Sequence, residues 1–345
     1  MIPAATVSLH VSPPSPPHLQ PARWQQLWRE AVRDPRELLS MLGLEALSGR
    51  ISEAAAAQFP LRVPRGFVAR MRKGDAHDPL LRQVLPLDDE MRMVAGFVSL
   101  DAVGDAAARA GTGLLQKYRG RALLVATGSC AVNCRYCFRR HFPYAEETAA
   151  REGWREAVES IRADASIEEV ILSGGDPLSL ATSKLAELTE ALKGIPHLKR
   201  LRIHTRLPVV LPERVDAGLL EWLGRLPWPV AVVLHANHAN EFDAQVDAAM
   251  AGLRGTGAQL LNQAVLLRGV NDSVQALAEL SERSFAAGVL PYYLHQLDRV
   301  AGVAHFEVPD HQAKRLHAAL AARVSGYLVP RLVREVAGDT GKRPL

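Results

Sequence analysis

The sequence predicts an α/β protein in which six parallel strands alternate with helices, preceded by a mainly helical region and followed by a short tail. Three observations support this fold class. Short apolar runs rich in β-branched residues recur about every 30 residues, segments of helical periodicity fill several gaps, and polar residues gather where the runs end. Six units in a row favour a full or partial (β/α) barrel over a doubly wound sheet. The runs span residues 122–127, 168–175, 200–206, 230–237, 259–267 and 289–298.

The chain divides into three predicted parts. Residues 1–110 are expected to be mainly helical, because apolar residues from Trp24 to Leu42 recur at helical spacing, with a break at Pro35. Residues 111–330 hold the strand-and-helix units of the barrel core. Residues 331–345 form a short C-terminal segment.

Composition limits the classes of partner and compartment. The formal net charge is +4 and no block of like charges stands out, so the sequence does not require a nucleic acid. The chain lacks a window of about 20 apolar residues, and its N-terminus lacks the basic and apolar regions of a signal peptide. We therefore expect a cytoplasmic protein with no membrane partner and no direct nucleic-acid partner.

Polar side chains lie at the ends of the six apolar runs. Because the carboxyl ends of parallel strands meet at one face of a barrel, these side chains are expected to line one active site. In chain order the residues concerned are Cys130, the glycines Gly174 and Gly175 with Asp176, then His204, Thr205, Arg206, His235, Asn237, Asn262 and Gln263 within the fifth run, and Asp298.

All three cysteines of the chain lie within CAVNCRYC, at Cys130, Cys134 and Cys137. A disulfide with one free thiol is disfavoured by a reducing compartment. A zinc site would take a fourth ligand such as His141. An iron–sulfur cluster held by three thiolates would leave one iron of a [4Fe–4S] cube without a protein ligand. Catalysis requires such an open position, whereas an electron-transfer site would normally close it.

CAVNCRYC resembles the CxxxCxxC signature of radical S-adenosylmethionine (SAM) enzymes, whose fold is a partial parallel (β/α)6 barrel. The resemblance implies that the three cysteines hold a [4Fe–4S] cluster and that SAM binds its open iron and yields a 5′-deoxyadenosyl radical. It places Tyr136 beside the adenine, and the glycines of the Ser173–Pro177 turn near the methionyl amino group. The further SAM contacts that it implies are Gly174, Gly175, Asp176, His235 and Gln263.

Segments far from the cysteines, among them LPVVLPERV, HANHANE, LLNQAVLLRGVND, PYYLHQLD and SGYLVPRLVREV, resemble lysine 2,3-aminomutases. The resemblance covers the chain from about residue 60 to its end. It implies a second cofactor, pyridoxal 5′-phosphate (PLP), bound as a Schiff base to Lys342 in a C-terminal PLP-binding tail. Lys117 and Arg121 match arginines that hold the cofactor phosphate, and Lys117 departs from arginine.

The same resemblance implies how a substrate is held. Arg139 matches an arginine that pairs with the substrate carboxylate, for which its planar fork is suited. Asp298 and Glu335 match acids that bind a distal ammonium, and Glu335 stands where the family usually has Asp. Two carboxylates at that end favour a cationic side chain, so lysine is the expected small-molecule substrate.

The implied reaction converts (S)-α-lysine to (R)-β-lysine by radical 1,2-amino migration, with electrons from a flavodoxin- or ferredoxin-type reductant. The chain stops three residues after Lys342 and has no further cysteines. In this it resembles the short form that makes β-lysine for elongation factor P and works with the lysyl ligase of that factor. A catabolic or osmolyte-producing lysine 2,3-aminomutase, an aminomutase for another cationic amino acid, and a non-catalytic Fe–S module remain alternatives. A radical enzyme that methylates RNA would need further cysteines. A homo-oligomer is left open.

Overall fold

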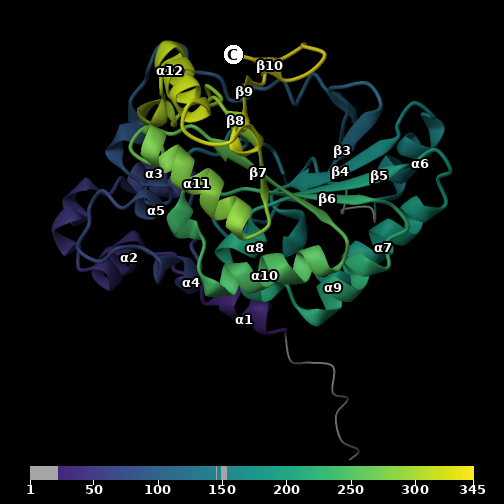
Figure 1. Ribbon diagram of the computed structural model, residues 1–345, viewed down its shortest axis with the longest axis horizontal. Helices are drawn as coiled ribbons and strands as arrows, with labels where there is room; N and C mark the ends of the chain where they lie inside the picture. The colour runs from purple at the N-terminus through teal and green to yellow at the C-terminus, as the bar shows by residue number, and fades with distance from the viewer. Residues whose placement is uncertain (1–21, 145, 149–153) are drawn as a thin grey trace, which may run out of the picture.

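The computed structural model describes residues 22–144, 146–148 and 154–345, and within them the strands form one ten-stranded sheet in the order β1 to β10 (Figure 1). From β3 to β9 every neighbouring pair is parallel, whereas β1, β2 and β10 pair antiparallel. All six predicted strands are present, as β3 to β8. The strands are β1 (Arg109–Gly111), β2 (Leu114–Leu115), β3 (Arg121–Thr127), β4 (Glu169–Gly174), β5 (Arg200–Thr205), β6 (Val230–Leu234), β7 (Gln259–Val265), β8 (Leu290–His295), β9 (Arg331–Arg334) and β10 (Arg343–Pro344).

Helices alternate with the parallel strands, and α7, α9, α10 and α11 follow one another along the outside of the sheet (Figure 1). Asp216, Asp243 and Ser273 each accept a hydrogen bond from a backbone N–H of the helix that they cap, which explains where α9, α10 and α11 begin. The predicted partial (β/α)6 barrel is confirmed. Among the described residues, none of the helices has the length and apolar character needed to cross a bilayer. The barrel helices are α6 (Arg155–Ala163), α7 (Thr182–Lys193), α8 (Leu207–Val210), α9 (Ala217–Gly224), α10 (Ala244–Gly255), α11 (Val274–Ala286) and α12 (Asp310–Ala321).

Strand β9 extends the parallel series by one strand beyond those predicted. It pairs with β8, where Tyr293 lies opposite Arg331 and His295 opposite Val333. Strand β10 then returns antiparallel along β9, so the end of the chain forms a hairpin at the edge of the sheet. Glu335 directly follows β9 and Lys342 directly precedes β10.

The N-terminal region is helical, as expected, and packs against the barrel. The predicted break at Pro35 is the start of α2, where the Asp34 side chain accepts a hydrogen bond from the Arg36 N–H. Trp24 of α1 is buried beneath the guanidinium of Arg214, which lies 4.6 Å from the ring centroid. Since one hydrophobic core joins Trp24 to the barrel, a boundary at residue 110 stays a prediction. The N-terminal helices are α1 (Arg23–Arg29), α2 (Pro35–Leu42), α3 (Glu53–Gln58), α4 (Arg65–Val68) and α5 (Pro79–Arg82).

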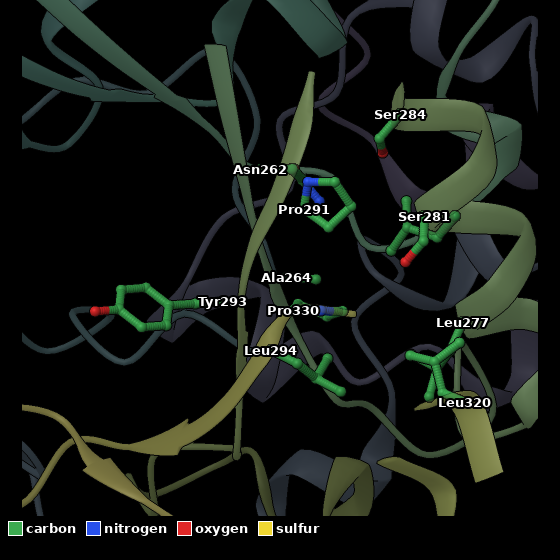
Figure 2. A pocket seen from close by; sticks show the side chains of 11 residues that line it. Asn262, Ala264, Leu277, Ser281, Ser284, Pro291, Tyr293, Leu294, Leu320 and Pro330 are labelled. Atoms are coloured by element: carbon green, nitrogen blue, oxygen red, sulfur yellow. The ribbon is translucent and has the colours of Figure 1, made fainter. Parts of the chain in front are cut away.

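The sheet separates an outer apolar layer from an inner polar one. Figure 2 shows Leu294 of β8 pointing toward Leu277 of α11 and Leu320 of α12, with only about 10 Å³ of space left between these elements. Tyr293, the neighbouring residue, points to the opposite side of the sheet. This alternation places Tyr293 inside the barrel, where it lines a much larger cavity.

Candidate active site

One cavity of about 290 Å³ lies at the carboxyl ends of the parallel strands and reaches into the barrel. Its wall includes His235, which follows β6, Asp298, which follows β8, and Arg121, which lies deeper, on β3. Every residue predicted to bind a metal, a cofactor or the substrate lines this cavity. These residues are Lys117, Arg121, Cys130, Cys134, Tyr136, Cys137, Arg139, Gly174, Gly175, Asp176, His235, Gln263, Asp298, Glu335 and Lys342. The expectation that Asn237 and Asn262 line the same site is wrong, because both amides are buried in structural hydrogen bonds: Asn237 Oδ1 accepts from the Val265 N–H, and Asn262 Oδ1 accepts from the Ala236 N–H.

The N-terminal region holds the loop that carries the three cysteines. The carbonyl of Cys130 accepts hydrogen bonds from Trp28 Nε1 (3.3 Å) and Arg62 Nη1 (3.1 Å). Arg135 is fully buried within the loop and donates to both carboxylate oxygens of Glu90, at 2.8 and 2.5 Å. These long-range contacts orient the cysteine loop toward the barrel.

Glycines at the end of β4 let two backbones approach closely. A Cβ added at Gly174, whose φ is +120°, would lie 2.4 Å from the Thr127 carbonyl oxygen. A Cβ added at Gly175 would lie 2.4 Å from the carbonyl oxygen of Ser129, the residue before Cys130. Only glycine fits at both positions, so the β4 turn packs directly against the start of the cysteine loop.

Asp176 joins the turns that follow β4 and β5. Its buried carboxylate accepts hydrogen bonds from the backbone N–H groups of Leu178 (3.0 Å), Arg206 (2.7 Å) and Leu207 (3.0 Å), and from the Thr205 hydroxyl (2.7 Å). Burial raises the pKa of Asp176, and these hydrogen bonds oppose that effect. The side chain therefore positions the two turns, while its predicted contact with SAM stays a prediction.

Arg206 connects the cysteine loop to the predicted adenine contacts. Its Nη1 lies 2.7 Å from Cys134 Sγ and 2.6 Å from the Tyr136 hydroxyl, and its Nη2 lies 2.8 Å from Glu241 Oε2. The Tyr136 hydroxyl also lies 3.1 Å from His235 Nε2, and the two rings stack with centroids 5.7 Å apart. Burial, with the charge of Arg206, lowers the pKa of His235 to about 3, so His235 is neutral at physiological pH.

Five side chains of alternating charge form a continuous series of ion pairs: four of them line the cavity, and Asp105 lies behind it. Asp105 lies 2.7 Å from Arg139 Nε through Oδ2 and 2.7 Å from Lys117 Nζ through Oδ1. Glu335 lies 2.9 Å from Lys117 Nζ through Oε1 and 2.6 Å from Lys342 Nζ through Oε2. These ion pairs therefore connect residues predicted to bind the substrate, Arg139 and Glu335, with residues predicted to bind PLP, Lys117 and Lys342.

Asp298 differs from the other acids of the cavity. Within the described part of the chain its carboxylate has no ion-pair partner, and the side chain is half-buried. Burial and the negative charge of Glu335 raise the pKa of Asp298 to about 7, against the opposing charges of Lys342 and Lys117. The cavity thus holds an acid that a bound cation would ionise.

Comparison with known proteins identifies the family. Residues 124–271 match the family described as the Radical SAM superfamily. The chain is 50% identical over 326 residues to an L-lysine 2,3-aminomutase of Escherichia coli (strain K12), covering 93% of this chain and 94% of that protein. It belongs to the lysine 2,3-aminomutase family. It is also 45% identical over 334 residues to the L-lysine 2,3-aminomutase of Haemophilus influenzae, with 97% and 98% covered. Identity to the L-lysine 2,3-aminomutase of Clostridium subterminale is 32% over 329 residues, with 94% of this chain and 78% of that protein covered.

Membership of the lysine 2,3-aminomutase family makes the chain a radical SAM isomerase whose cofactors are a [4Fe–4S] cluster, SAM and PLP. The donor set fits the cluster, since three free cysteines line one cavity. Burial and the neighbouring thiols raise the pKa of Cys137 to about 11, and burial raises the pKa of Cys130, so iron is needed to stabilise the thiolates. Among the described residues no three acidic, His or Cys side chains already converge as metal ligands. His141, the alternative zinc ligand, instead donates to the Ala301 carbonyl.

The region around Lys342 fits PLP. Lys342 Nζ lies 5.8 Å from the ring centroid of Tyr293. On the same wall, buried donor groups lack hydrogen-bond partners: the Tyr118 hydroxyl and Arg121 Nε, whose side chains stack with the guanidinium 4.8 Å from the ring centroid. A phosphate would satisfy these groups. Tyr118 was not predicted, although it stands between Lys117 and Arg121 in sequence.

The aminomutase cavity also contains inner barrel residues that the sequence analysis did not assign to a cofactor or a substrate. Arg202 and His204 of β5, with Tyr293 and His295 of β8, occupy alternate positions and line the cavity. Nε2 of each histidine is buried without a hydrogen-bond partner, and burial lowers the pKa of both rings. His204 was expected at this face without an assigned role, and the period-2 spacing of polar residues within the strands was the signal that could have found Arg202, Tyr293 and His295.

Proposed function

We propose that this protein converts (S)-α-lysine to (R)-β-lysine by a radical, PLP-dependent 1,2-amino migration. The main support for this proposal is the distribution of charged side chains in the cavity. The cationic fork of Arg139 stands on its wall together with two acids, Asp298 and Glu335, and with Lys342 and the three cysteines. A cavity with groups for both a carboxylate and a distal ammonium suits a cationic amino acid.

The proposed roles follow from chemistry and charge. Arg139 pairs with the substrate carboxylate, while Asp298 and Glu335 receive the side-chain ammonium. Lys117 and Arg121 hold the cofactor phosphate. Lys342 is the covalent attachment site of PLP, and its short distance to Glu335 keeps its ammonium paired when it is not attached. When bound, the cluster and SAM supply a 5′-deoxyadenosyl radical and PLP supplies an electron-accepting ring.

For the SAM site, we propose contacts with Tyr136, Gly174, Gly175, Asp176, His235 and Gln263. The stacking of Tyr136 on His235 provides a flat, neutral surface suited to an adenine ring. The close backbone packing at Gly174 and Gly175 supports a role in which main-chain groups, rather than side chains, face the methionyl end.

One anaerobic assay tests the activity. Reconstituted protein with lysine, SAM, PLP and reductant should form β-lysine, and chiral derivatisation should identify the (R) product. Lys342→Ala should lose activity while keeping its iron, and Cys134→Ala should lose both. Lys184→Ala serves as a control, since Lys184 is exposed and forms an ion pair with Glu187 on the surface of α7. Product formation by Lys342→Ala would remove the basis for the PLP assignment.

We propose further that the β-lysine is used to modify elongation factor P, through the lysyl ligase of that factor, and that a flavodoxin- or ferredoxin-type protein supplies the electrons. The identity to the L-lysine 2,3-aminomutase of E. coli over nearly the whole of both chains supports the formation of β-lysine, on which this role depends. Deletion of the gene should lower the mass of elongation factor P by that of one β-lysyl group. An unchanged mass would instead favour a catabolic or osmolyte-producing role.

A further inference from the structure

Asp105 is a buried acid that lies behind the cavity wall, in contact with two residues that line it, and the family resemblance did not point to it. Its side chain is only 3% exposed. The carboxylate bridges two cations that come from different parts of the chain: Arg139 follows the cysteine loop, and Lys117 lies between β2 and β3. The Asp105 carboxylate therefore contacts both Arg139, proposed to bind the substrate carboxylate, and Lys117, proposed to bind the PLP phosphate.

The turn that carries Asp105 is itself fixed. The two carboxylate oxygens of Asp101 accept hydrogen bonds from the backbone N–H groups of Asp105 and Ala106, both at 2.9 Å. Gly104, with φ at +70°, packs against Ala337, and a Cβ at Gly104 would lie 2.9 Å from the Ala337 Cβ. The turn is thus held on one side by its own hydrogen bonds and on the other by the segment between Glu335 and Lys342.

The contacts of Arg139 leave one edge of its guanidinium open. Nε donates to Asp105 and Nη1 donates to the Ser173 hydroxyl at 3.2 Å. Among the described residues, Nη2 donates no hydrogen bond. The rings of Phe138 and Phe142 lie 5.0 and 5.7 Å from the guanidinium carbon. The fork is therefore held through Nε, and its Nη1–Nη2 edge stays available to a carboxylate.

Charge reinforces this arrangement. Burial by itself raises the pKa of Asp105, but the charges and hydrogen bonds of Arg139 and Lys117 outweigh it and lower the pKa below its usual value. Asp105 is therefore ionised at physiological pH and offsets part of the charge of both cations. Without it, Arg139 would lose its ion pair, and Lys117 would keep only the pair with Glu335, which Glu335 shares with Lys342, among the described residues.

We propose that Asp105 is a positioning residue that fixes the spacing between Arg139 and Lys117, and so sets the affinity for the carboxylate of an amino-acid substrate and for the phosphate of PLP. This inference rests on the proposed function, since it takes Arg139 and Lys117 as the groups that bind these two anions. Because the Asp105 contact uses Nε, it does not compete with a substrate for the open edge of Arg139.

The test uses the full chain with all cofactors and compares Asp105→Asn, Asp105→Glu and Asp247→Asn. Asp247 pairs with Arg283 between α10 and α11, outside the cavity, and serves as the matched control. We expect Asp105→Asn to raise the KM for lysine about ten- to hundredfold, because one charge-assisted hydrogen bond to Arg139 is lost. The kcat should stay within about threefold of the wild-type value. The Kd of PLP, measured by equilibrium dialysis, should rise in the same variant about three- to tenfold. Asp105→Glu, with charge kept but spacing altered, should give an intermediate KM, and Asp247→Asn should match wild type.

The outcomes separate this inference from the proposed function. If wild type forms no β-lysine, the proposed function fails, and the Kd of PLP still tests whether Asp105 positions Lys117. If wild type is active and Asp105→Asn has a wild-type or lower KM, the positioning role is overturned. If thermal unfolding shows that Asp105→Asn does not fold, the test rests on Asp105→Glu. A wild-type KM for lysine and a wild-type Kd of PLP in that variant overturn the positioning role of Asp105.

Discussion

The ammonium of Lys342 lies 2.6 Å from Oε2 of Glu335, and the register of the C-terminal hairpin brings them together. Arg343 of β10 lies opposite Arg334 of β9. Glu335, which follows Arg334, and Lys342, which precedes Arg343, therefore lie opposite each other where the loop begins and ends. The loop between them is therefore closed by an ion pair between the proposed PLP lysine and a proposed substrate-binding acid. Any substrate ammonium that reaches Glu335 meets a site already occupied by another cation.

This ion pair predicts an acid-dependent loss of stability. Burial raises the pKa of Glu335, but the charges of Lys342 and Lys117 outweigh burial and hold it at about 2, against a usual value of 4.5. Since the folded-state pKa is lowered, the stabilisation is fully present above about pH 4.5 and is lost as pH falls toward 2. At 1.36 kcal/mol per pKa unit, Glu335→Gln should lower the free energy of unfolding by about 3 kcal/mol at pH 7. Urea unfolding between pH 3 and pH 7 measures this.

Glu307→Gln provides the control for that experiment, because the ion pair between Glu307 and Arg299 is more exposed than the pair between Glu335 and Lys342. Its cost should stay below about 1 kcal/mol at any of these pH values. A cost for Glu335→Gln that is the same at pH 3 as at pH 7 would show that ionisation of Glu335 does not stabilise the fold.

The strands and the cysteine motif were predictable because they are local patterns. The apolar runs behind β3 to β8 are long enough to show strand periodicity, whereas β9, RLVR, has an arginine at each end and only two apolar residues, so it was missed. Asp105 and Arg206 were harder to assign. Their roles depend on ion pairs that join distant segments: Asp105 meets Lys117 and Arg139, and Arg206 meets Glu241 and Cys134. No spacing rule within one segment reports such contacts.

Asp298 predicts a pH dependence of lysine binding. Its carboxyl, with a pKa raised to about 7 by burial and by Glu335, attracts an ammonium only when it is ionised. The substrate ammonium stays protonated in this range, with a pKa near 10.4. The KM for lysine should therefore rise as pH falls below about 7, by up to about tenfold per pH unit, and level off above it. Steady-state kinetics from pH 6 to pH 8.5 would show this.

Asp298→Asn separates this titration from other ionisations of the substrate and the enzyme. The variant should have a higher KM at pH 8 and should lack the added slope below pH 7. If the ratio of variant to wild-type KM is constant across this range, Asp298 does not titrate on substrate binding.

The glycine at the end of β4 predicts a specific defect. In Gly175→Ala the new Cβ would meet the backbone of Gly128 and Ser129, at 2.4 to 2.8 Å, so the start of the cysteine loop must move. We expect a loss of stability of about 1–3 kcal/mol, as for overpacking, together with less iron bound per chain after reconstitution. Gly224→Ala, at a position of α9 with no neighbour within 4 Å, should leave the iron content unchanged. Equal iron in Gly175→Ala and wild type would contradict the argument.

Arg206 predicts a strong coupling with Glu241. Both side chains are buried, and Glu241 also accepts hydrogen bonds from the Asn237 and His238 N–H groups. Arg206→Met would leave the Glu241 carboxylate buried without its cation, at a cost of about 3–5 kcal/mol in the free energy of unfolding.

Adding Glu241→Gln to Arg206→Met removes the unpaired charge, so the double variant should be less destabilised than the sum of the two single variants by about 0.5–3 kcal/mol. Arg214→Met is the matched control, since Arg214 is fully buried but donates to the carbonyls of Leu178 and Leu180. Its loss should cost about 1–3 kcal/mol and show no coupling to Glu241. Additive costs for Arg206→Met and Glu241→Gln would mean that the pair is not the unit that holds Cys134 and Tyr136 in place.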